Sequence, residues 1–335
     1  MSSVQSVLTP RPPKRPRTGR AARAQDPATG KPKAAGSARR REIWAAYGFI
    51  SPWIIGFVVF TAGPMLASLV LSFTDYDAIG STHNVGFANY QQLFEDPQVA
   101  KSLMNTLIFA VLRVPLAMAF ALVLAMLLLK VGRTAGFFRT VFYLPVMTPP
   151  VAVGILFLLL FNGNVGLINH VLGLFGIEGP SWTTDSFWVK PGLVLTSLWS
   201  VGSTVVIYFA ALRNVPKDLY EAAELDGASR WTSFRHVTLP QISGTLFFTL
   251  IVNTIASLQT FTEAYTAFFG TATTQSYSSD AALFYVVYLF QQAFQYMHMG
   301  YASALAWLLF LVILVITIIQ AKVSKRFVYY EGDQR

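Results

Sequence analysis

Long apolar runs alternate with short polar segments over most of the chain. Six runs hold about 18 or more mainly apolar residues, the length that an α-helix needs to cross a bilayer. They lie at residues 47–73, 103–129, 137–161, 192–212, 242–265 and 301–321. The pattern predicts an all-α integral membrane protein with six transmembrane helices in a domain of residues 43–328. The shorter segment 281–294, rich in Tyr, Phe and Leu, predicts an amphipathic helix against the bundle or the membrane surface.

Proline residues interrupt several of these runs. Pro145, Pro149 and Pro150 lie together in the third run, and Pro115 lies in the second. Proline lacks an amide hydrogen and clashes with the preceding turn, so we expect kinks at these places. The carbonyl groups that a kink frees are tolerated only beside neighbouring helices or water, and a cavity can therefore form near Pro145–Pro150.

The charged residues are few and unevenly placed. Of 335 residues, 54% are hydrophobic and 12% are charged, which is about half the charge of an ordinary soluble domain. The absence of cysteine excludes disulfides, thiolate metal sites and a cysteine nucleophile. The whole net charge of +9 lies in residues 1–42, which hold eleven Lys and Arg residues, two acidic residues and six prolines. This composition predicts a disordered basic cytoplasmic tail that fixes topology or contacts anionic lipids, and nucleic-acid binding is the least favoured use.

The basic residues of the loops predict the orientation. With the tail in the cytoplasm, the loops on that side hold eleven Lys and Arg residues outside the tail, whereas the opposite loops hold only Lys101 and Lys190. Positive residues accumulate on the cytoplasmic side of a membrane. We therefore expect both termini to be cytoplasmic.

The segment 216–240, between the fourth and fifth runs, has the pattern of a helical hairpin. Pro216 and Asp218 favour the start of a helix, and Gly227 favours a left-handed helix end. Ser229 can cap a second short helix that reaches Phe234. Leu239-Pro240 then predicts a break before the fifth run.

This hairpin carries a motif of fixed spacing. Glu221-Ala222-Ala223 is followed after three residues by Gly227, and after nine more by Val237-Thr238-Leu239-Pro240. The motif resembles the signature of permeases of binding-protein-dependent ABC importers, which is Glu-Ala-Ala, three residues, Gly, nine residues, Ile-x-Leu-Pro. Val237 in place of Ile is the one departure.

Further segments look like the maltose-type, carbohydrate branch of that family: Asn105-Thr106-Leu107, Tyr143-Leu144-Pro145 and Gly300-Tyr301-Ala302-Ser303-Ala304. The segment Gly270–Thr273 differs from the pattern of that branch, whose members usually have Thr-Gly-Gly-Gly-Pro at this place. The resemblance covers roughly residues 45–328.

The resemblance implies a permease subunit of an ABC-type sugar importer in a bacterial cell membrane. Such a subunit forms the translocation path with a second, homologous permease above two ATPase subunits, and an extracytoplasmic sugar-binding protein docks outside. The hairpin would lie in a groove of the ATPase. The coupling residues implied in this way are Glu221, Ala222, Ala223, Asp226, Gly227, Leu239 and Pro240. The chain has no Gly-x-x-x-x-Gly-Lys-Ser/Thr phosphate loop, so ATP-Mg is expected on the partner ATPase and no cofactor on this chain.

A few polar residues fall within the apolar runs. A charge at membrane depth costs about 2.5–3.5 kcal/mol on insertion scales, so Arg113 should face the bundle or a water-filled path, either paired with Glu263 or touching substrate. On one continuous helix, Gln259 and Glu263 share a face and Asn253 lies off it. Together with Tyr208, these residues are candidates for the substrate path, and they are equally candidates for polar links between helices.

Other functions are weighed against this one. A permease for glycerol 3-phosphate or another small polar solute is the nearest alternative, but a phosphate would favour more than one basic residue in the path. An integral-membrane enzyme would need a convergent polar constellation, and a lone secondary transporter would need two inverted halves. The sequence shows neither pattern. The four histidines are scattered, so no metal site and no catalytic residue is expected.

Overall fold

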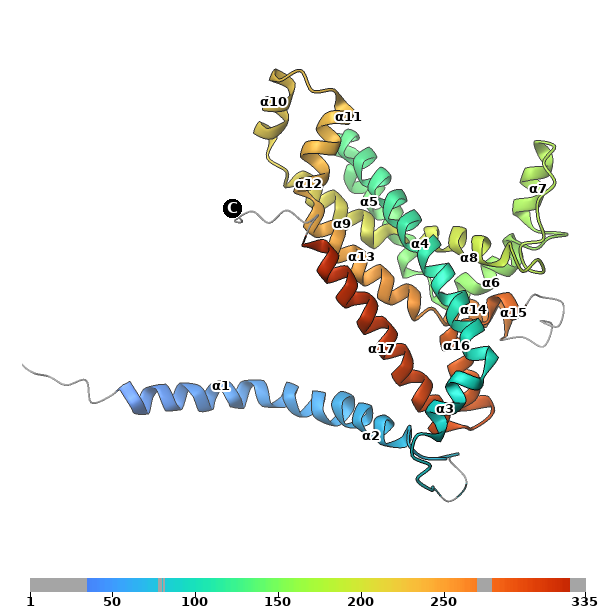
Figure 1. Ribbon diagram of the computed structural model, residues 1–335. Coiled ribbons are helices and arrows are strands. Elements are labelled where there is room, and N and C mark those ends of the chain that lie inside the picture. Colours follow the sequence, from blue (N-terminus) through green and yellow to red (C-terminus); the bar gives the residue numbers. More distant parts are fainter. Residues whose placement is uncertain (1–34, 78–79, 81, 270–278, 326–335) are drawn as a thin grey trace, which may run out of the picture. The chain divides into compact units, whose positions relative to one another are not determined.

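The computed structural model describes residues 35–77, 80, 82–269 and 279–325, which are helical apart from turns and one isolated bridge between Thr74 and Asn84 (Figure 1). The α-helices are α1 (Ala35–Phe57), α2 (Gly63–Leu71), α3 (Ala88–Glu95), α4 (Pro97–Lys130), α5 (Ala135–Tyr143), α6 (Pro150–Leu160), α7 (Leu167–Leu174), α8 (Val189–Ser197), α9 (Gly202–Arg213), α10 (Lys217–Leu225), α11 (Arg230–Ser233), α12 (Leu239–Gln241), α13 (Ser243–Leu258), α14 (Thr262–Phe268), α15 (Ser279–Ala282), α16 (Tyr285–Phe290) and α17 (Met299–Ser324). Short 3-10 or π turns join some of them: η1 (Val58–Ala62), η2 (Gly132–Thr134), η3 (Leu144–Met147), η4 (Leu198–Ser200), η5 (Phe234–Thr238) and η7 (Gln291–Gln295).

Four helices are long and apolar enough to cross a membrane: Arg39–Leu71, Pro97–Lys130, Ser243–Phe268 and Met299–Ser324. Two bent pairs also qualify together: Ala135–Met147 with Pro150–Leu160, and Val189–Ser200 with Gly202–Arg213. The first pair meets at 93° and the second at 56°, which gives up to six spans if each pair is one span. The chain is therefore an all-helical membrane protein, as the hydropathy pattern predicts. The kink expected near Pro145–Pro150 is present, whereas α4 continues through Pro115.

The chain divides into two compact units, residues 1–61 and residues 62–335. In the first unit, α1 begins at Ala35, so residues 35–42 of the predicted tail are helical. The rest of that tail, residues 1–34, lies outside the described residues. The apolar side chains of α1 are exposed, Phe49 and Trp53 among them. The first predicted span thus lies in a helix that begins before the hydropathy run of 47–73.

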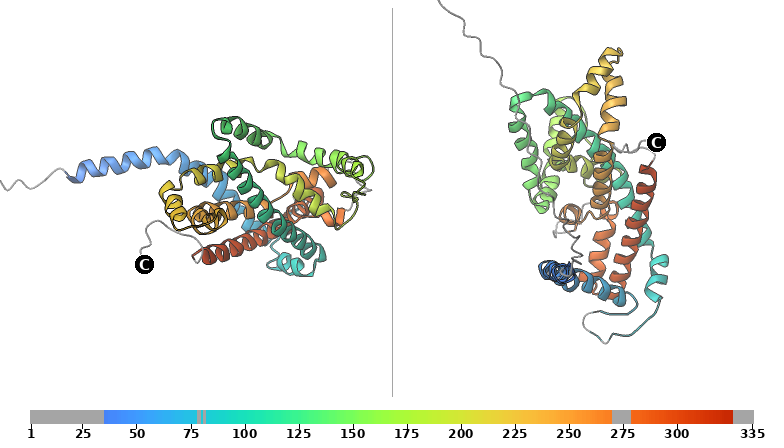
Figure 2. Two further views of the ribbon diagram at one scale, coloured as in Figure 1. Left: turned by 90° about the horizontal axis from the view of Figure 1, so that it is seen from above. Right: turned by 90° about the vertical axis from the view of Figure 1, so that its left-hand side faces the viewer.

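In the second unit, α4 runs through two clusters of buried side chains. Near one end it packs with α9, where Ala117, Ala121 and Ala125 recur every four residues and are buried with Val205 and Phe209. Small residues on one helix face allow two backbones to approach closely in a membrane. Toward the other end, the second cluster of buried side chains includes Phe109, Phe157, Phe284 and Leu305. Figures 1 and 2 show α10 and α11 projecting beyond one end of α4, with α3 at the other end.

Hydrogen bonds to Asp96 tie together the end of the unit that carries α3. Asp96 caps α4 by accepting a hydrogen bond from the Gln98 amide at 2.9 Å. Its Oδ2 also accepts hydrogen bonds from the Tyr288 hydroxyl and, at 2.8 Å, from the Tyr301 hydroxyl. Burial, reinforced by the Asp96 carboxylate, raises the pKa of Tyr288, so its hydroxyl keeps the proton that it donates. The carboxylate also suits the positive end of the α4 dipole.

The segment 281–294 differs from its predicted form. It is broken into α15, α16 and η7, and most of its side chains up to Tyr288 are buried between α4 and α17. The Asn105 side chain donates to the Leu283 carbonyl at 3.0 Å, and the Tyr285 amide donates to the Thr106 hydroxyl at 2.9 Å. These bonds from α4 satisfy the backbone groups that the breaks expose. The segment therefore packs against the bundle, which is one of the two predicted positions, but it is a broken and largely buried part of the core and not a single amphipathic helix.

We expect Gly202→Ala to destabilise the fold. A Cβ at Gly202 would lie 2.0 Å from the carbonyl oxygen of Phe142, and such overpacking typically costs about 1–3 kcal/mol. A thermal unfolding scan of the purified full chain in detergent measures the effect. Gly173→Ala is the matched control because nothing lies within 4 Å of its Cβ position. Equal midpoints for the two variants would contradict the close approach of α9 to α5.

Candidate functional site

The hairpin formed by α10 and α11 ends its first helix with internal hydrogen bonds. Gly227 has a φ of 75°, a left-handed conformation that glycine adopts without steric cost. Its amide donates to the Glu224 carbonyl at 3.0 Å, and the Ala228 amide donates to the Ala223 carbonyl at 2.9 Å. This pair of bonds is a Schellman motif. The helix end predicted at Gly227 is confirmed, and the carbonyls of Ala222, Ala223 and Glu224 are satisfied by amides of the hairpin itself.

The second half of the hairpin begins as the sequence predicts but continues further. Ser229 caps α11 by accepting a hydrogen bond from the Thr232 amide at 3.2 Å. The helical path then passes through η5, a π turn, into α12, which contains Leu239 and Pro240. The break predicted at Leu239-Pro240 is therefore misplaced. The interruption lies at Ile242, which has a non-helical conformation with φ −93° and ψ 4°.

The hairpin presents both acidic and apolar side chains to its surroundings. No residue of α10 is buried, and Glu221, Ala222 and Glu224 are exposed. Leu225 is 90% exposed and Trp231 is 68% exposed, which is unusual for large apolar side chains. The hairpin is held at its base, where the Tyr220 hydroxyl and the Thr238 hydroxyl are 2.9 Å apart. The signature motif did not single out Leu225 or Trp231, and only their exposure in the fold reveals them.

A second candidate site is a cavity of about 190 Å³ among the membrane helices, lined in part by Arg113 and Glu263. Three helix breaks meet there. Thr148 lies at the break between η3 and α6, Ser200 lies at the bend before α9, and Thr260 lies between α13 and α14. Irregular backbone at membrane depth is tolerated where it lines a polar cavity, and binding sites of transporters form at such breaks. Sequence reasoning missed these hydroxyl residues, together with Thr196 and Ser197, although Pro149 and Pro150 marked one of the breaks.

Arg113 reaches this cavity without forming the ion pair considered from the sequence. Its Nη1 donates a hydrogen bond to the Ser257 hydroxyl at 3.1 Å, and its guanidinium lies 5.8 Å from the centre of the Phe109 ring. Glu263 lines the same cavity, but no carboxylate oxygen of the described residues lies within 4.0 Å of the Arg113 nitrogens. The guanidinium group of Arg113 and the carboxylate of Glu263 therefore line the same cavity without forming an ion pair.

Three other sequence candidates lie outside the cavity. Tyr208 is fully buried, and its hydroxyl lies 2.7 Å from that of Thr249. The Asn253 side chain donates to the Thr249 carbonyl at 2.8 Å. Gln259 is exposed at the end of α13. The prediction that Gln259 and Glu263 share one helix face is wrong, because the helix is interrupted at residues 259–261 and its rotation is not continuous.

No group of three or more His, Asp or Glu side chains in the described part of the chain is arranged to hold a metal ion. The polar groups of the membrane cavity are mainly hydroxyls, which donate and accept hydrogen bonds but do not provide a nucleophile with a neighbouring base. The arrangement suits the binding of a polar molecule.

Cysteine labelling can test whether water reaches this cavity, since the natural chain contains no cysteine. We expect Thr148→Cys, Ser200→Cys and Thr260→Cys to react readily with a small water-soluble thiol reagent, because only a hydrated thiol ionises and reacts. Thr249→Cys and Thr254→Cys are the controls, because both residues are buried away from the cavity. Mass spectrometry of the intact protein measures the extent of labelling. Equal labelling rates at the cavity and control positions would contradict the assignment.

Comparison with known proteins places the chain in a family. Residues 113–329 match the family described as "Binding-protein-dependent transport system inner membrane component". The probable ABC transporter permease protein YesP of Bacillus subtilis is 40% identical over 88% of this chain and 95% of its own length. The lactose transport system permease protein LacF of Rhizobium radiobacter is 34% identical over 81% of this chain and 91% of its own length. The sn-glycerol-3-phosphate transport system permease protein UgpA of Pectobacterium atrosepticum is 30% identical over 87% of this chain and 97% of its own length.

A solved structure shares the fold. A chain of a bacterial ABC transporter involved in the import of the acidic polysaccharide alginate superimposes with a TM-score of 0.74. It is 24% identical, and the match covers 88% of this chain and 99% of that one. Together with the family match and the more similar relatives, these observations lead to one conclusion: the chain belongs to the family of inner membrane permease components of binding-protein-dependent ABC transport systems.

Proposed function

We propose that this chain is the permease subunit of an ABC importer for mono- or oligosaccharides. The observation that carries the proposal is the α10–α11 hairpin, which bears the signature motif and holds Leu225 and Trp231 exposed beyond the helix bundle. An exposed apolar patch with acidic neighbours is typical of a docking surface. In the proposed assembly, the hairpin docks on one of two ATPase subunits, which bind ATP-Mg. A second, homologous permease completes the path, and an extracytoplasmic solute-binding protein delivers the substrate.

The proposed orientation puts the hairpin and both termini in the cytoplasm of a bacterial cell. Its support is the distribution of Lys and Arg, which are concentrated in the loops at the hairpin end and scarce in the others. The α3 end of the structure, with Asp96 and the Lys101–Asp280 ion pair at 2.6 Å, would then face the binding protein.

Within the membrane, we assign the substrate path to the cavity around Arg113 and Glu263. Hydroxyl groups of a sugar both donate and accept hydrogen bonds, which suits the facing guanidinium and carboxylate and the hydroxyls of Thr148, Ser200 and Thr260. Tyr208, Asn253 and Gln259 would act away from this cavity, as links between helices or as contacts for a partner.

Glycerol 3-phosphate is the second candidate substrate, and the 30% identity to UgpA is the observation that favours it. The charges of the cavity argue against it. Glu263 balances Arg113 there, so a doubly charged phosphate would meet no net positive charge. A neutral carbohydrate fits this balance better.

The importer proposal predicts that the hairpin transmits ATP hydrolysis. The full assembly, reconstituted in liposomes with its binding protein, should hydrolyse ATP faster when the right solute is added. A panel of saccharides and glycerol 3-phosphate identifies that solute. We expect Glu221→Lys and Gly227→Pro to lower the stimulated rate at least about tenfold, the equivalent of about 1.4 kcal/mol. Gly227→Pro acts because proline fixes φ near −65°, whereas Gly227 has a φ of 75°.

Gly176→Pro is the matched control for the hairpin variant. Gly176 also has a positive φ, 72°, and open space around it, but it follows α7 far from the hairpin. The ATPase subunit should co-purify with Gly176→Pro and be lost from Gly227→Pro. If both variants retain the ATPase and respond equally to solute, the hairpin is only a connector.

A further inference from the structure

Two arginines converge on one aromatic ring at the hairpin end of the membrane helices. The guanidinium carbon of Arg139 lies 4.9 Å from the centre of the Phe209 ring, and that of Arg213 lies 5.8 Å from it. Both arginines line a hollow of about 360 Å³ between the end of α4, the start of α5 and the end of α9. Gly132 and Gly136 also line it, and the absence of side chains there keeps it open.

These arginines have no carboxylate partner in the described part of the chain. Neither takes part in an ion pair there, and the one side-chain hydrogen bond is from Arg139 Nε to the Ala135 carbonyl at 3.4 Å. The sequence explains this, because no Asp or Glu occurs between Asp96 and Glu178 or between Asp185 and Asp218. The helices that form the hollow therefore supply positive charge only. Arginine pairs at such a position are suited to phosphate, which accepts their forked donors.

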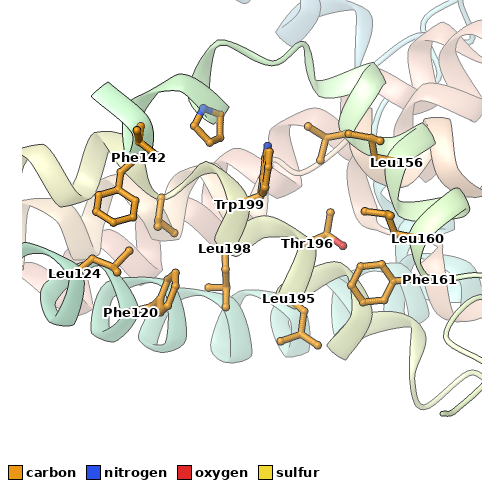
Figure 3. Close-up of a pocket in the computed structure, with 14 residues that line it drawn as sticks. Phe120, Leu124, Phe142, Leu156, Leu160, Phe161, Leu195, Thr196, Leu198 and Trp199 are labelled. Carbon is orange, nitrogen blue, oxygen red and sulfur yellow. The ribbon is translucent and has the colours of Figure 1, made fainter. Parts of the chain in front are cut away.

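An apolar cavity is lined by neighbouring positions of the same helices, α4 and α5. It measures about 610 Å³, and its lining is apolar apart from the Thr196 hydroxyl and the indole nitrogen of Trp199 (Figure 3). On α4 the lining passes from Leu128 in the hollow to Leu124 and Phe120 in the cavity. On α5 it passes from Arg139 to Val141 and Phe142. Because α4 and α5 run in opposite directions through the membrane, both sequences lead from the hairpin end toward the membrane interior.

We propose that the hollow and the cavity together bind one anionic phospholipid of the inner leaflet, such as phosphatidylglycerol. Arg139 and Arg213 bind its phosphate, and an acyl chain enters the apolar cavity beside Phe120 and Phe142. The size, the one-sided charge and the change from basic to apolar lining with depth match a phospholipid. Basic pockets between membrane helices on the cytoplasmic side bind acidic headgroups. The choice of leaflet rests on the proposed orientation, but the binding itself does not depend on which solute is transported.

The position of Arg213 gives the lipid a role beside the coupling hairpin. Arg213 is the last residue of α9, and α10 begins at Lys217. A phosphate shared by Arg139 and Arg213 therefore joins the base of the hairpin to α5, whose continuation through η3 reaches Thr148 in the membrane cavity. The lipid acts as a link between these two helices.

Native mass spectrometry of the full assembly in mild detergent tests the proposal by titration with phosphatidylglycerol or phosphatidylcholine. Both lipids carry the phosphate, but the choline cation of phosphatidylcholine is repelled by the two arginines, so we expect one phosphatidylglycerol to bind with preference. The double variant Arg139→Gln/Arg213→Gln should weaken that binding at least about tenfold, since each basic residue near a lipid surface contributes on the order of 1 kcal/mol. Lys322→Gln/Lys325→Gln removes the same charge from the end of α17, outside the hollow, and should leave the affinity unchanged.

Further measurements separate a lipid site from a site for a soluble phosphate. If the double variant does not assemble, Arg213→Gln alone removes an exposed side chain and should still lower the affinity. Glycerol phosphate at millimolar concentration should not displace the lipid; displacement would indicate a site for a soluble phosphate. A photoreactive acyl chain should label peptides that contain Phe142 or Trp199. Three outcomes would each overturn the proposal. The two lipids could bind equally, or the double and control variants could have equal affinity. The third outcome is that the acyl chain labels neither peptide because a second permease covers the cavity. Substrate-stimulated ATP hydrolysis by the same samples reports on the importer function separately.

Discussion

Backbone amide and carbonyl groups cannot be left without partners in the hydrocarbon of a membrane, and this constraint organises the structure. The helix α4 is unbroken over its whole length and packs in both buried clusters. Its neighbours break at membrane depth: between η3 and α6, before α9, and between α13 and α14. Each break carries a hydroxyl residue, and all three line the cavity into which Arg113 projects. The breaks and the charge thus share one cavity among the helices, which keeps them out of contact with lipid.

In the hairpin, backbone amide and carbonyl groups find their hydrogen-bond partners in a different way. Its helix ends are closed by their own Schellman bonds and by the Ser229 cap, so it needs no support from the bundle beyond its base. This independence leaves Leu225 and Trp231 free to contact another protein. After the interruption at Ile242, the chain enters α13, whose far end forms the break at Thr260. One helix therefore connects the proposed ATPase contact to the proposed substrate cavity.

Local signals predicted the hairpin well because its geometry is determined by neighbouring residues. Gly227 and Ser229 act on amides and carbonyls within five positions of themselves, so their effect can be read from spacing alone. The prediction for Gln259 and Glu263 was wrong for the opposite reason. It assumed an unbroken helix, whereas the helix is interrupted at residues 259–261, where Thr260 lines a cavity shared with residues of other helices. For the segment 281–294 the position against the bundle is confirmed, but the single helix is wrong, because Asn105 and Thr106, more than 170 residues earlier, bind its broken backbone in the core.

The sequence by itself determined the membrane class, the approximate spans, the kink near Pro145–Pro150 and the hairpin with its signature motif. These features depend on hydropathy and on hydrogen bonds between near neighbours, both of which are local. Tertiary structure alone decided that Arg113 donates to Ser257, that it faces Glu263 across a cavity, and that Arg139 and Arg213 share the ring of Phe209. Such arrangements join residues from different helices, and the rotation of each helix against its neighbours is fixed by packing, which no single segment encodes.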